Sequence, residues 1–205
     1  VIRDLGLELR IVFNKGAVMV LPAGINKATG LKAALDELNL SPHNVVAIGD
    51  AENDHALLNF AEYGVAVANA VPMLKETADW TTKGERGAGV VEVVIDLLEN
   101  DLQAETREVV RHRILLGKRD SGEEVTFYPA RRNLLLAGTS GSGKSTLATG
   151  ILERLGQQGY QFCVIDPEGD YEGFPEAIIL GTAERGPAVN EILTALDKPG
   201  NSVVV

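Results

Sequence analysis

Residues 138–146 read GTSGSGKST and match the pattern GxxxxGK[ST], a glycine-rich turn that surrounds phosphate. Its glycines let successive backbone N–H groups converge on phosphate oxygens, and the start of the following helix adds partial positive charge. We expect Lys144 to reach the β- and γ-phosphates and the Ser145 hydroxyl to hold Mg²⁺. An apolar run at 134–137 and a helical pattern at 147–155 supply the expected strand and helix. The residues expected to contact ATP are Gly138, Ser140, Gly141, Gly143, Lys144, Ser145 and Thr146.

A second candidate set lies in the first half of the chain and consists of Lys27, Asp50 and Asp54. The stretch VVAIGD predicts a short buried strand that ends at Asp50, and a helical pattern at 52–63 follows it. Asp54 is then one helical turn from Asp50 on the same face. Two carboxylates suit Mg²⁺ and an ammonium suits a phosphate. The spacing alone leaves open a simpler alternative, in which the two acids are a helix cap and a solvated helix residue.

The elements that must position these residues alternate between strand and helix, which is typical of a parallel α/β sheet. In such sheets, ligands bind beyond the carboxyl ends of the strands. We expect two partial three-layer domains, residues 1–100 and 101–205, with the boundary near 100–106. The predicted strands include a strand pair within 1–20, a hairpin at 114–129, the run 134–137, the buried strand FCVID, the run 177–180 and the final SVVV.

Composition limits the classes of protein to which the chain can belong. Of 205 residues, 45% are hydrophobic and 23% are charged, as in ordinary globular domains. The net charge of −10 disfavours a broad nucleic-acid-binding surface. No apolar run reaches the roughly 18 residues of a membrane span, so we expect a cytoplasmic protein without a membrane partner. The single cysteine, Cys163, excludes an internal disulfide and is expected to be a buried apolar residue.

The two ends and the middle of the chain give two further expectations. The chain opens on Val1 in a helix-like segment and closes within an apolar strand, so we expect a piece of a longer polypeptide. Acids are interleaved with the basic residues between 107 and 132, which favours a solvated surface over a DNA or phosphate contact. Those basic residues are Arg107, Arg111, Arg113, Lys118, Arg119, Arg131 and Arg132.

Residues 21–98 resemble the C-terminal part of Cof-like phosphatases of the haloacid dehalogenase superfamily. GINKATGL supplies the lysine of that family's third motif as Lys27, and GDAENDHALL matches its fourth motif. The resemblance implies a Mg²⁺-dependent hydrolase of phosphorylated small molecules, with catalytic roles for Lys27 and Asp50 and metal ligation by Asp50 and Asp54. Residues 1–20 would then be the tail of the cap. The family's nucleophile lies in an Asp-x-Asp motif, which has no counterpart before Lys27, because Asp4 has a glycine two positions on. We therefore expect negligible phosphatase activity from this stretch alone.

The second half resembles the HerA/FtsK-like branch of P-loop ATPases. A hairpin, GTSGSGKST and VIDPEGDY follow one another in the order of that branch. The resemblance implies ATP hydrolysis by a homo-oligomeric, usually hexameric, ring that moves DNA or protein. Asp166, Glu168 and Asp170 correspond to the family's second-strand signature, although they also fit acids that cap a turn. The acid of a Walker B strand would follow Val205.

Three hypotheses remain open. The first is a phosphatase fused to an ATPase, the second is a phosphatase with a regulatory nucleotide-binding module, and the third is an assembly protein in which a degenerate phosphatase half is attached to an ATPase ring. An upstream Asp-x-Asp motif is expected under the first two hypotheses, and downstream Walker B acids under the first and third. A small-molecule kinase is a weaker fourth alternative.

Overall fold

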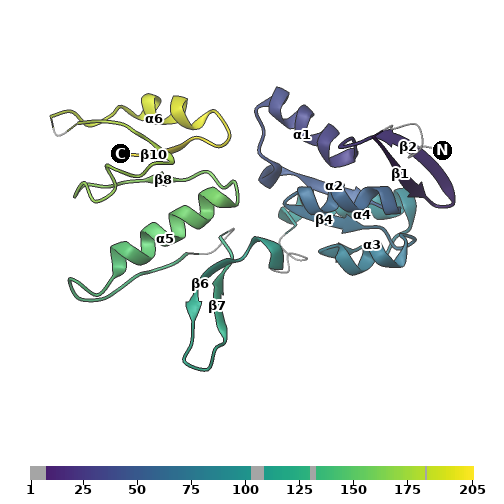
Figure 1. Cartoon of the computed structure of the whole chain (residues 1–205), viewed down its shortest axis with the longest axis horizontal. Coiled ribbons are helices and arrows are strands. Elements are labelled where there is room, and N and C mark those ends of the chain that lie inside the picture. Colours follow the sequence, from purple (N-terminus) through teal and green to yellow (C-terminus); the bar gives the residue numbers. More distant parts are fainter. Residues whose placement is uncertain (1–7, 103–108, 130–132, 183) are drawn as a thin grey trace. The chain divides into compact units, whose positions relative to one another are not determined.

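Strands and helices alternate along the chain, which is α/β with parallel sheets and divides into two units, Val1–Val109 and Val110–Val205 (Figure 1). This computed structural model describes residues 8–102, 109–129, 133–182 and 184–205. The interdomain boundary expected near 100–106 lies largely outside the described residues, as do Asp4, Arg107, Arg131 and Arg132.

The first unit has a three-stranded parallel sheet in the order β3–β4–β5. Its strands are β3 (Val46–Gly49), β4 (Tyr63–Ala66) and β5 (Trp80–Thr81). Its helices are α1 (Lys27–Leu38), α2 (His55–Phe60), α3 (Pro72–Thr77) and α4 (Arg86–Asn100), with short 3₁₀ helices η1 (Pro42–Asn44) and η2 (Glu52–Asp54). All four residues of β4 are buried, as expected for the middle strand of a covered sheet. Leu58 of α2 and Leu74 of α3 are buried in the same core.

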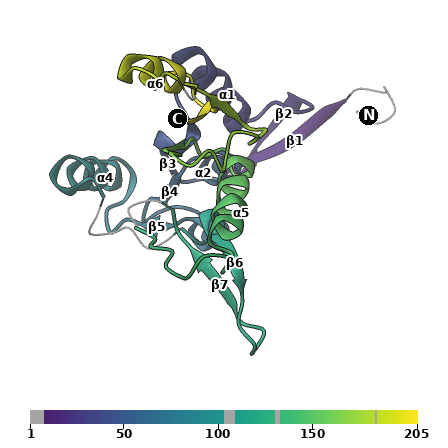
Figure 2. The same ribbon diagram turned by 90° about the vertical axis from the view of Figure 1, so that its left-hand side faces the viewer.

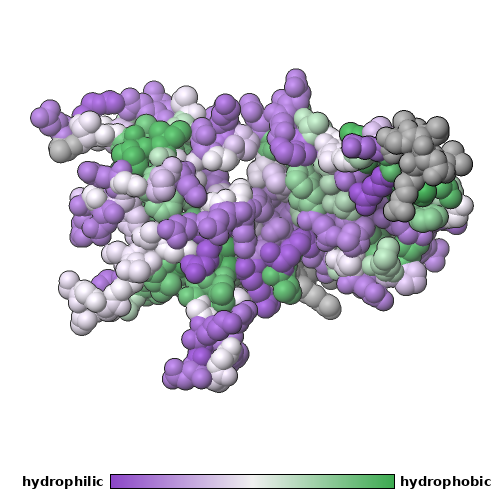
Figure 3. Space-filling view, viewed as in Figure 1, coloured by the Kyte–Doolittle hydropathy of each residue, from purple (hydrophilic) through white to green (hydrophobic). Residues whose placement is uncertain are grey.

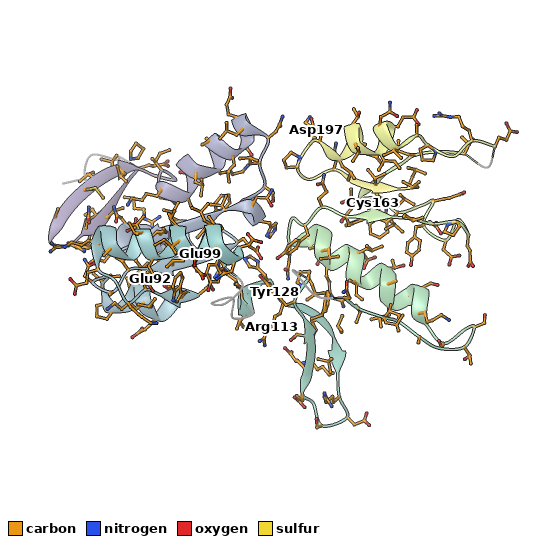
Figure 4. All side chains as sticks on the ribbon, turned by 180° about the vertical axis from the view of Figure 1, so that it is seen from behind. Glu92, Glu99, Arg113, Tyr128, Cys163 and Asp197 are labelled. Atoms are coloured by element: carbon orange, nitrogen blue, oxygen red, sulfur yellow. The ribbon has the colours of Figure 1, made fainter. Side chains whose placement is uncertain are left out.

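Local sequence explains where the elements of the first unit begin and end. Asn26 caps α1, because its side chain accepts the Thr29 N–H at 3.0 Å while the Thr29 hydroxyl accepts the Asn26 N–H at 3.0 Å. At the start of α4, the Glu92 carboxylate accepts the backbone N–H groups of Lys83 and Gly84 at 3.0 and 2.9 Å (Figure 4). The helix expected over 52–63 was predicted too long: it is a 3₁₀ turn followed by α2, and residue 63 already belongs to β4.

A two-stranded antiparallel hairpin precedes α1 in the first unit and is visible in Figures 1 and 2. It consists of β1 (Leu9–Asn14) and β2 (Ala17–Pro22), so the strand pair expected in this region is present. Lys15 and Gly16 form its turn with φ angles of 45° and 88°. Two successive positive φ angles are what a two-residue turn of type I′ requires.

The second unit has its own three-stranded parallel sheet, in the order β8–β10–β9. The strands are β8 (Cys163–Val164), β9 (Ala177–Ile179) and β10 (Ser202–Val204). The other elements are η3 (Val110–His112), the hairpin β6 (Ile114–Lys118) and β7 (Glu124–Phe127), and the helices α5 (Lys144–Gln157) and α6 (Val189–Leu196). Val189 and Leu193 of α6 are exposed. Figure 3 shows hydrophobic surface on the second unit.

Two sequence-based expectations for the second unit are wrong. Residues 134–137 form no strand, and Leu135 is 87% exposed. A strand needs a hydrogen-bonding neighbour, and among the described residues none is paired with this run. Cys163 is exposed, not buried (Figure 4), because FCVID alternates between the two faces of a sheet edge: Phe162 and Val164 are half-buried whereas Cys163 and Ile165 are exposed. Within the described part of the chain, no helix has the length and apolar character to cross a membrane.

Candidate functional site

Asp54 is the buried centre of the candidate site in the first unit. It lies in η2, just after the carboxyl end of β3, and is 3% exposed. Its Oδ2 accepts the backbone N–H groups of Asp50 at 2.9 Å and Ala51 at 3.0 Å, and its Oδ1 forms an ion pair with the Lys27 ammonium. Burial acts to raise the pKa of Asp54, but the Lys27 hydrogen bond and the two N–H donors outweigh it, and the pKa lies below the ordinary value. Asp54 is therefore held as a carboxylate.

Lys27 reaches Asp54 from the first position of α1, directly after the capping residue Asn26. The Lys27 side chain remains 48% exposed, so its ammonium is accessible to a ligand as well as to Asp54. The structure thus places Lys27, Asp50 and Asp54 in one cluster at the carboxyl edge of the parallel sheet.

Asp50 faces a residue that was not among the expected site residues. Its side chain is 44% exposed and its Oδ2 forms an ion pair with the Lys15 ammonium, from the turn of the β1–β2 hairpin. The Lys15 backbone N–H also donates to Glu52 Oε2 at 3.0 Å, and this bond is the main reason that the pKa of Glu52 is lowered. The sequence indicated a turn at Asn14-Lys15-Gly16, but no local signal connected that turn with Asp50.

The donor atoms around Asp54 fit Mg²⁺. The Asp50 and Asp54 carboxylates are hard oxygen ligands. The amide oxygen Oδ1 of Asn53, between them in sequence, is buried and has no hydrogen-bond partner among the described residues. A buried acceptor without a donor is costly unless a ligand satisfies it. By their chemistry these residues would hold a divalent cation.

Gly49 is required by the close approach of Asp54. A Cβ atom at position 49 would lie 2.5 Å from the Asp54 Cβ and 2.9 Å from its Cγ. We therefore expect Gly49→Ala to lower the free energy of unfolding of the first unit by about 1–3 kcal/mol, the usual cost of overpacking. Urea unfolding followed by the fluorescence of Trp80, the single tryptophan, would measure this.

Gly30→Ala is the matched control for that substitution. Nothing lies within 4 Å of a Cβ added at Gly30, inside α1, so alanine should stabilise this helix by about 0.5–1 kcal/mol. Equal unfolding midpoints for Gly49→Ala and the wild type would contradict the packing argument.

The glycine-rich loop of the second unit turns into α5 through two glycines with positive φ angles. Gly141 and Gly143 have φ angles of 76° and 87°, and Gly143 is the N-cap of α5. Lys144 begins this helix, and its ammonium donates to the Thr139 carbonyl at 2.9 Å across the loop. Gly138 lies against the loop as well, because a Cβ there would be 2.6 Å from Ser142 Oγ. Ser140 is exposed in the loop, and Thr146 is exposed in the first turn of α5.

The acids that follow β8 have different surroundings. Asp166 accepts the backbone N–H groups of Gly169 at 3.1 Å and Tyr171 at 2.7 Å, which is the role of an acid that stabilises a turn. Asp170 instead faces the loop, and the Ser145 hydroxyl donates to its Oδ2 at 3.4 Å. Burial, with the negative charges of Asp170 and Asp166, raises the pKa of Tyr171. Of these acids, Asp170 is the one placed beside the expected Mg²⁺ ligand Ser145.

A hollow of about 830 Å³ adjoins the loop along α5. Leu116 of β6 and Leu147 of α5 give it apolar walls, and Gly143 and Ser145 lie at the end next to the loop. Its volume is within the range of sites for cofactor-sized ligands.

Comparison with known proteins assigns a different resemblance to each unit. Residues 7–94 match the family of haloacid dehalogenase-like hydrolases, and residues 122–195 match the central domain of helicase HerA. Phosphoglycolate phosphatase 2 of Saccharolobus solfataricus is 41% identical over 96 residues, which are 47% of this chain and 41% of that protein. Phosphoglycolate phosphatase of Methanoculleus marisnigri is 39% identical over 94 residues, 46% of this chain and 40% of that protein.

Solved structures also match part of the chain. A haloacid dehalogenase-like hydrolase from Bacteroides thetaiotaomicron is 32% identical with a TM-score of 0.41, and the match covers 47% of this chain and 36% of that one. The chain spans about two fifths of the length of the two curated phosphatases. Residues 7–94 are thus similar to haloacid dehalogenase-like hydrolases, and residues 122–195 to the central domain of HerA.

Proposed function

We propose that the first unit contributes the metal- and phosphate-binding side of a Mg²⁺-dependent phosphomonoesterase site. The observation that carries this proposal is the cluster of Lys27, Asp50 and buried Asp54 at the carboxyl end of β3. The Lys27 ammonium binds a phosphoryl oxygen, and buried Asp54 orients that ammonium through their ion pair. Asp50 presents its carboxylate at the exposed side of the same cluster. A bound Mg²⁺ would supply positive charge to the phosphoryl group.

The chain provides no Asp-x-Asp motif before Lys27, so turnover is not the test of this proposal. The test is metal binding, for which Mn²⁺ is a suitable paramagnetic probe of an Mg²⁺ site. We expect Asp50→Asn to weaken Mn²⁺ binding by at least about 10–100-fold, the loss seen when even a supporting group of a metal site is removed. Titration followed by electron paramagnetic resonance would measure the affinity, and Mg²⁺ should displace the Mn²⁺.

Asp36→Asn is the matched control, because Asp36 is an exposed acid of α1 that pairs with Lys32, one helical turn earlier, at 2.7 Å. It removes the same charge outside the cluster and should leave the Mn²⁺ affinity unchanged. Equal affinities in Asp50→Asn and Asp36→Asn would overturn the proposal.

For the substrate we propose a small phosphate monoester that carries a carboxylate. Support comes from the two relatives named phosphoglycolate phosphatase and from the two lysines of the site, which give a ligand with two anionic groups more than one cation to pair with. Isothermal titration in the presence of Mg²⁺ would compare phosphoglycolate with inorganic phosphate. Tighter binding of inorganic phosphate would count against a carboxylate-bearing substrate.

For the second unit we propose Mg·ATP binding and, in the whole protein, HerA-like ATP hydrolysis. The supporting observation is the loop at 138–146, where two glycines with positive φ precede the N-terminus of α5. Lys144 would contact the β- and γ-phosphates, and Ser145 with Asp170 would hold Mg²⁺. The hollow along α5 has room for the nucleoside. By the same resemblance, we propose a homo-oligomeric ring with DNA or protein as the substrate that it moves.

A further inference from the structure

The turn of the β1–β2 hairpin is attached to the candidate metal site at two points. The Lys15 ammonium pairs with Asp50, and the Lys15 backbone N–H donates to Glu52 at 3.0 Å. Asp50 and Glu52 lie on either side of Ala51, immediately after β3. The turn therefore contacts residues 50–52 through both its main chain and its charged side chain.

The main-chain contact shows that Lys15 is held in place by the fold. The ladder between β1 and β2 continues to its last pair, Asn14 with Ala17, so the two turn residues have little freedom. Lys15 itself has a φ of 45°, a left-handed conformation that residues other than glycine and asparagine rarely adopt. Its ammonium is thus delivered to Asp50 by a short, closed hairpin.

Each of the two aspartates of the site is paired with a lysine before any metal binds. Two lysines face two aspartates, as Lys15 with Asp50 and Lys27 with Asp54. The Lys27–Asp54 pair has a buried carboxylate with two backbone donors, whereas the side chains of Lys15 and Asp50 are 40% and 44% exposed. An exposed pair is the weaker of the two and is the one that an entering cation can separate.

We propose that Lys15 is a tethered competitor of the divalent cation at Asp50. It neutralises Asp50 when the metal is absent and leaves the carboxylate when the metal binds. The affinity of the site for Mg²⁺ is therefore lower than it would be without the Lys15 ammonium. This inference rests on the proposed metal site of the first unit.

The test is an Mn²⁺ titration of the full 205-residue chain with lysine variants. Lys15→Met removes the ammonium and keeps the aliphatic length, and Lys15→Asn places at the turn a residue that tolerates positive φ. We expect both variants to bind Mn²⁺ about three- to tenfold more tightly, since an exposed ion pair and a like-charge repulsion are removed. Lys32→Met removes the same charge from an exposed pair on α1 and should leave the affinity unchanged.

A second readout follows the lysine itself. Mg²⁺ should raise the rate at which an amine-acylating reagent labels Lys15, measured by mass spectrometry, and should leave Lys32 labelling unchanged. Unchanged or weaker Mn²⁺ binding by Lys15→Asn, with a wild type that binds, overturns the competitor role and leaves the metal site standing. A wild type and variants that all fail to bind Mn²⁺ overturn the metal site, and the competitor role with it.

Discussion

Asp54→Ala is expected to lower the free energy of unfolding of the first unit by about 3 kcal/mol, and to abolish divalent-cation binding. The substitution leaves the N–H groups of Asp50 and Ala51 without their acceptor and Lys27 without its carboxylate. Each unsatisfied buried donor costs about 1–3 kcal/mol, while the exposure of Lys27 limits the loss from the ion pair. Trp80 lies in β5 of the same unit, so its fluorescence in urea reports on this unfolding step.

Asp54→Asn separates the two parts of that effect. The amide keeps an acceptor oxygen and nearly the same shape, so we expect a smaller loss of stability, about 1 kcal/mol, with metal binding still lost. An Asp54→Ala variant that unfolds at the wild-type urea concentration would show that the carboxylate does not organise the loop.

The difference in stability between the wild type and Asp54→Asn is expected to depend on pH. The pKa of folded Asp54 lies below the ordinary 3.8, so its charged form adds stability that is fully present above that value. This contribution is lost as the pH falls through the folded-state pKa. The stability difference between the wild type and Asp54→Asn should therefore be constant near neutral pH and shrink in acid below 3.8.

Lys144→Ala is expected to weaken Mg·ATP binding by about 10–100-fold. Hydrogen bonds between charged groups contribute about 1.5–3 kcal/mol, and each 1.4 kcal/mol is a factor of ten in the dissociation constant. The Lys144 ammonium donates a hydrogen bond at 2.9 Å to the Thr139 carbonyl, which belongs to an exposed loop. The fold should therefore tolerate the loss of this side chain. Isothermal titration calorimetry with Mg·ATP measures the affinity directly.

Lys198→Ala provides the control for charge, because Lys198 is an exposed lysine of the same unit outside the loop. Its affinity for Mg·ATP should match that of the wild type. An Lys144→Ala variant that binds Mg·ATP as tightly as Lys198→Ala would rule out the loop as the phosphate site.

The sequence was most informative where position follows from local pattern. Asp50 ends a short apolar run and Asp54 follows four residues later, so both had to lie at the carboxyl edge of the sheet. Lys27 could be added from its motif, and it meets Asp54 in the structure. Lys15 could not be found in this way, because its contact with Asp50 depends on how a hairpin packs against a loop 35 residues later in the chain.

Errors arose where an element depends on a distant neighbour. The run 134–137 has the apolar character of a strand, yet a strand also needs a partner for its backbone groups, and apolar sequence says nothing about that partner. Cys163 was expected to be buried because FCVID is apolar throughout. Only one face of that edge strand is covered, and whether Cys163 or Val164 faces inward depends on its pairing with β10.

The strand order of the second unit governs how this part of the chain folds during synthesis. β10 pairs with β8 on one side and with β9 on the other, although it comes after both in the chain. As the polypeptide leaves the ribosome, β8 and β9 are made before the strand that joins them, and their backbone groups remain bound to water until Ser202–Val204 emerges. Strand pairing in this sheet is therefore completed only after Ser202–Val204 has been made, and Val203 and Val204, which are buried in the folded chain, are covered only at that stage.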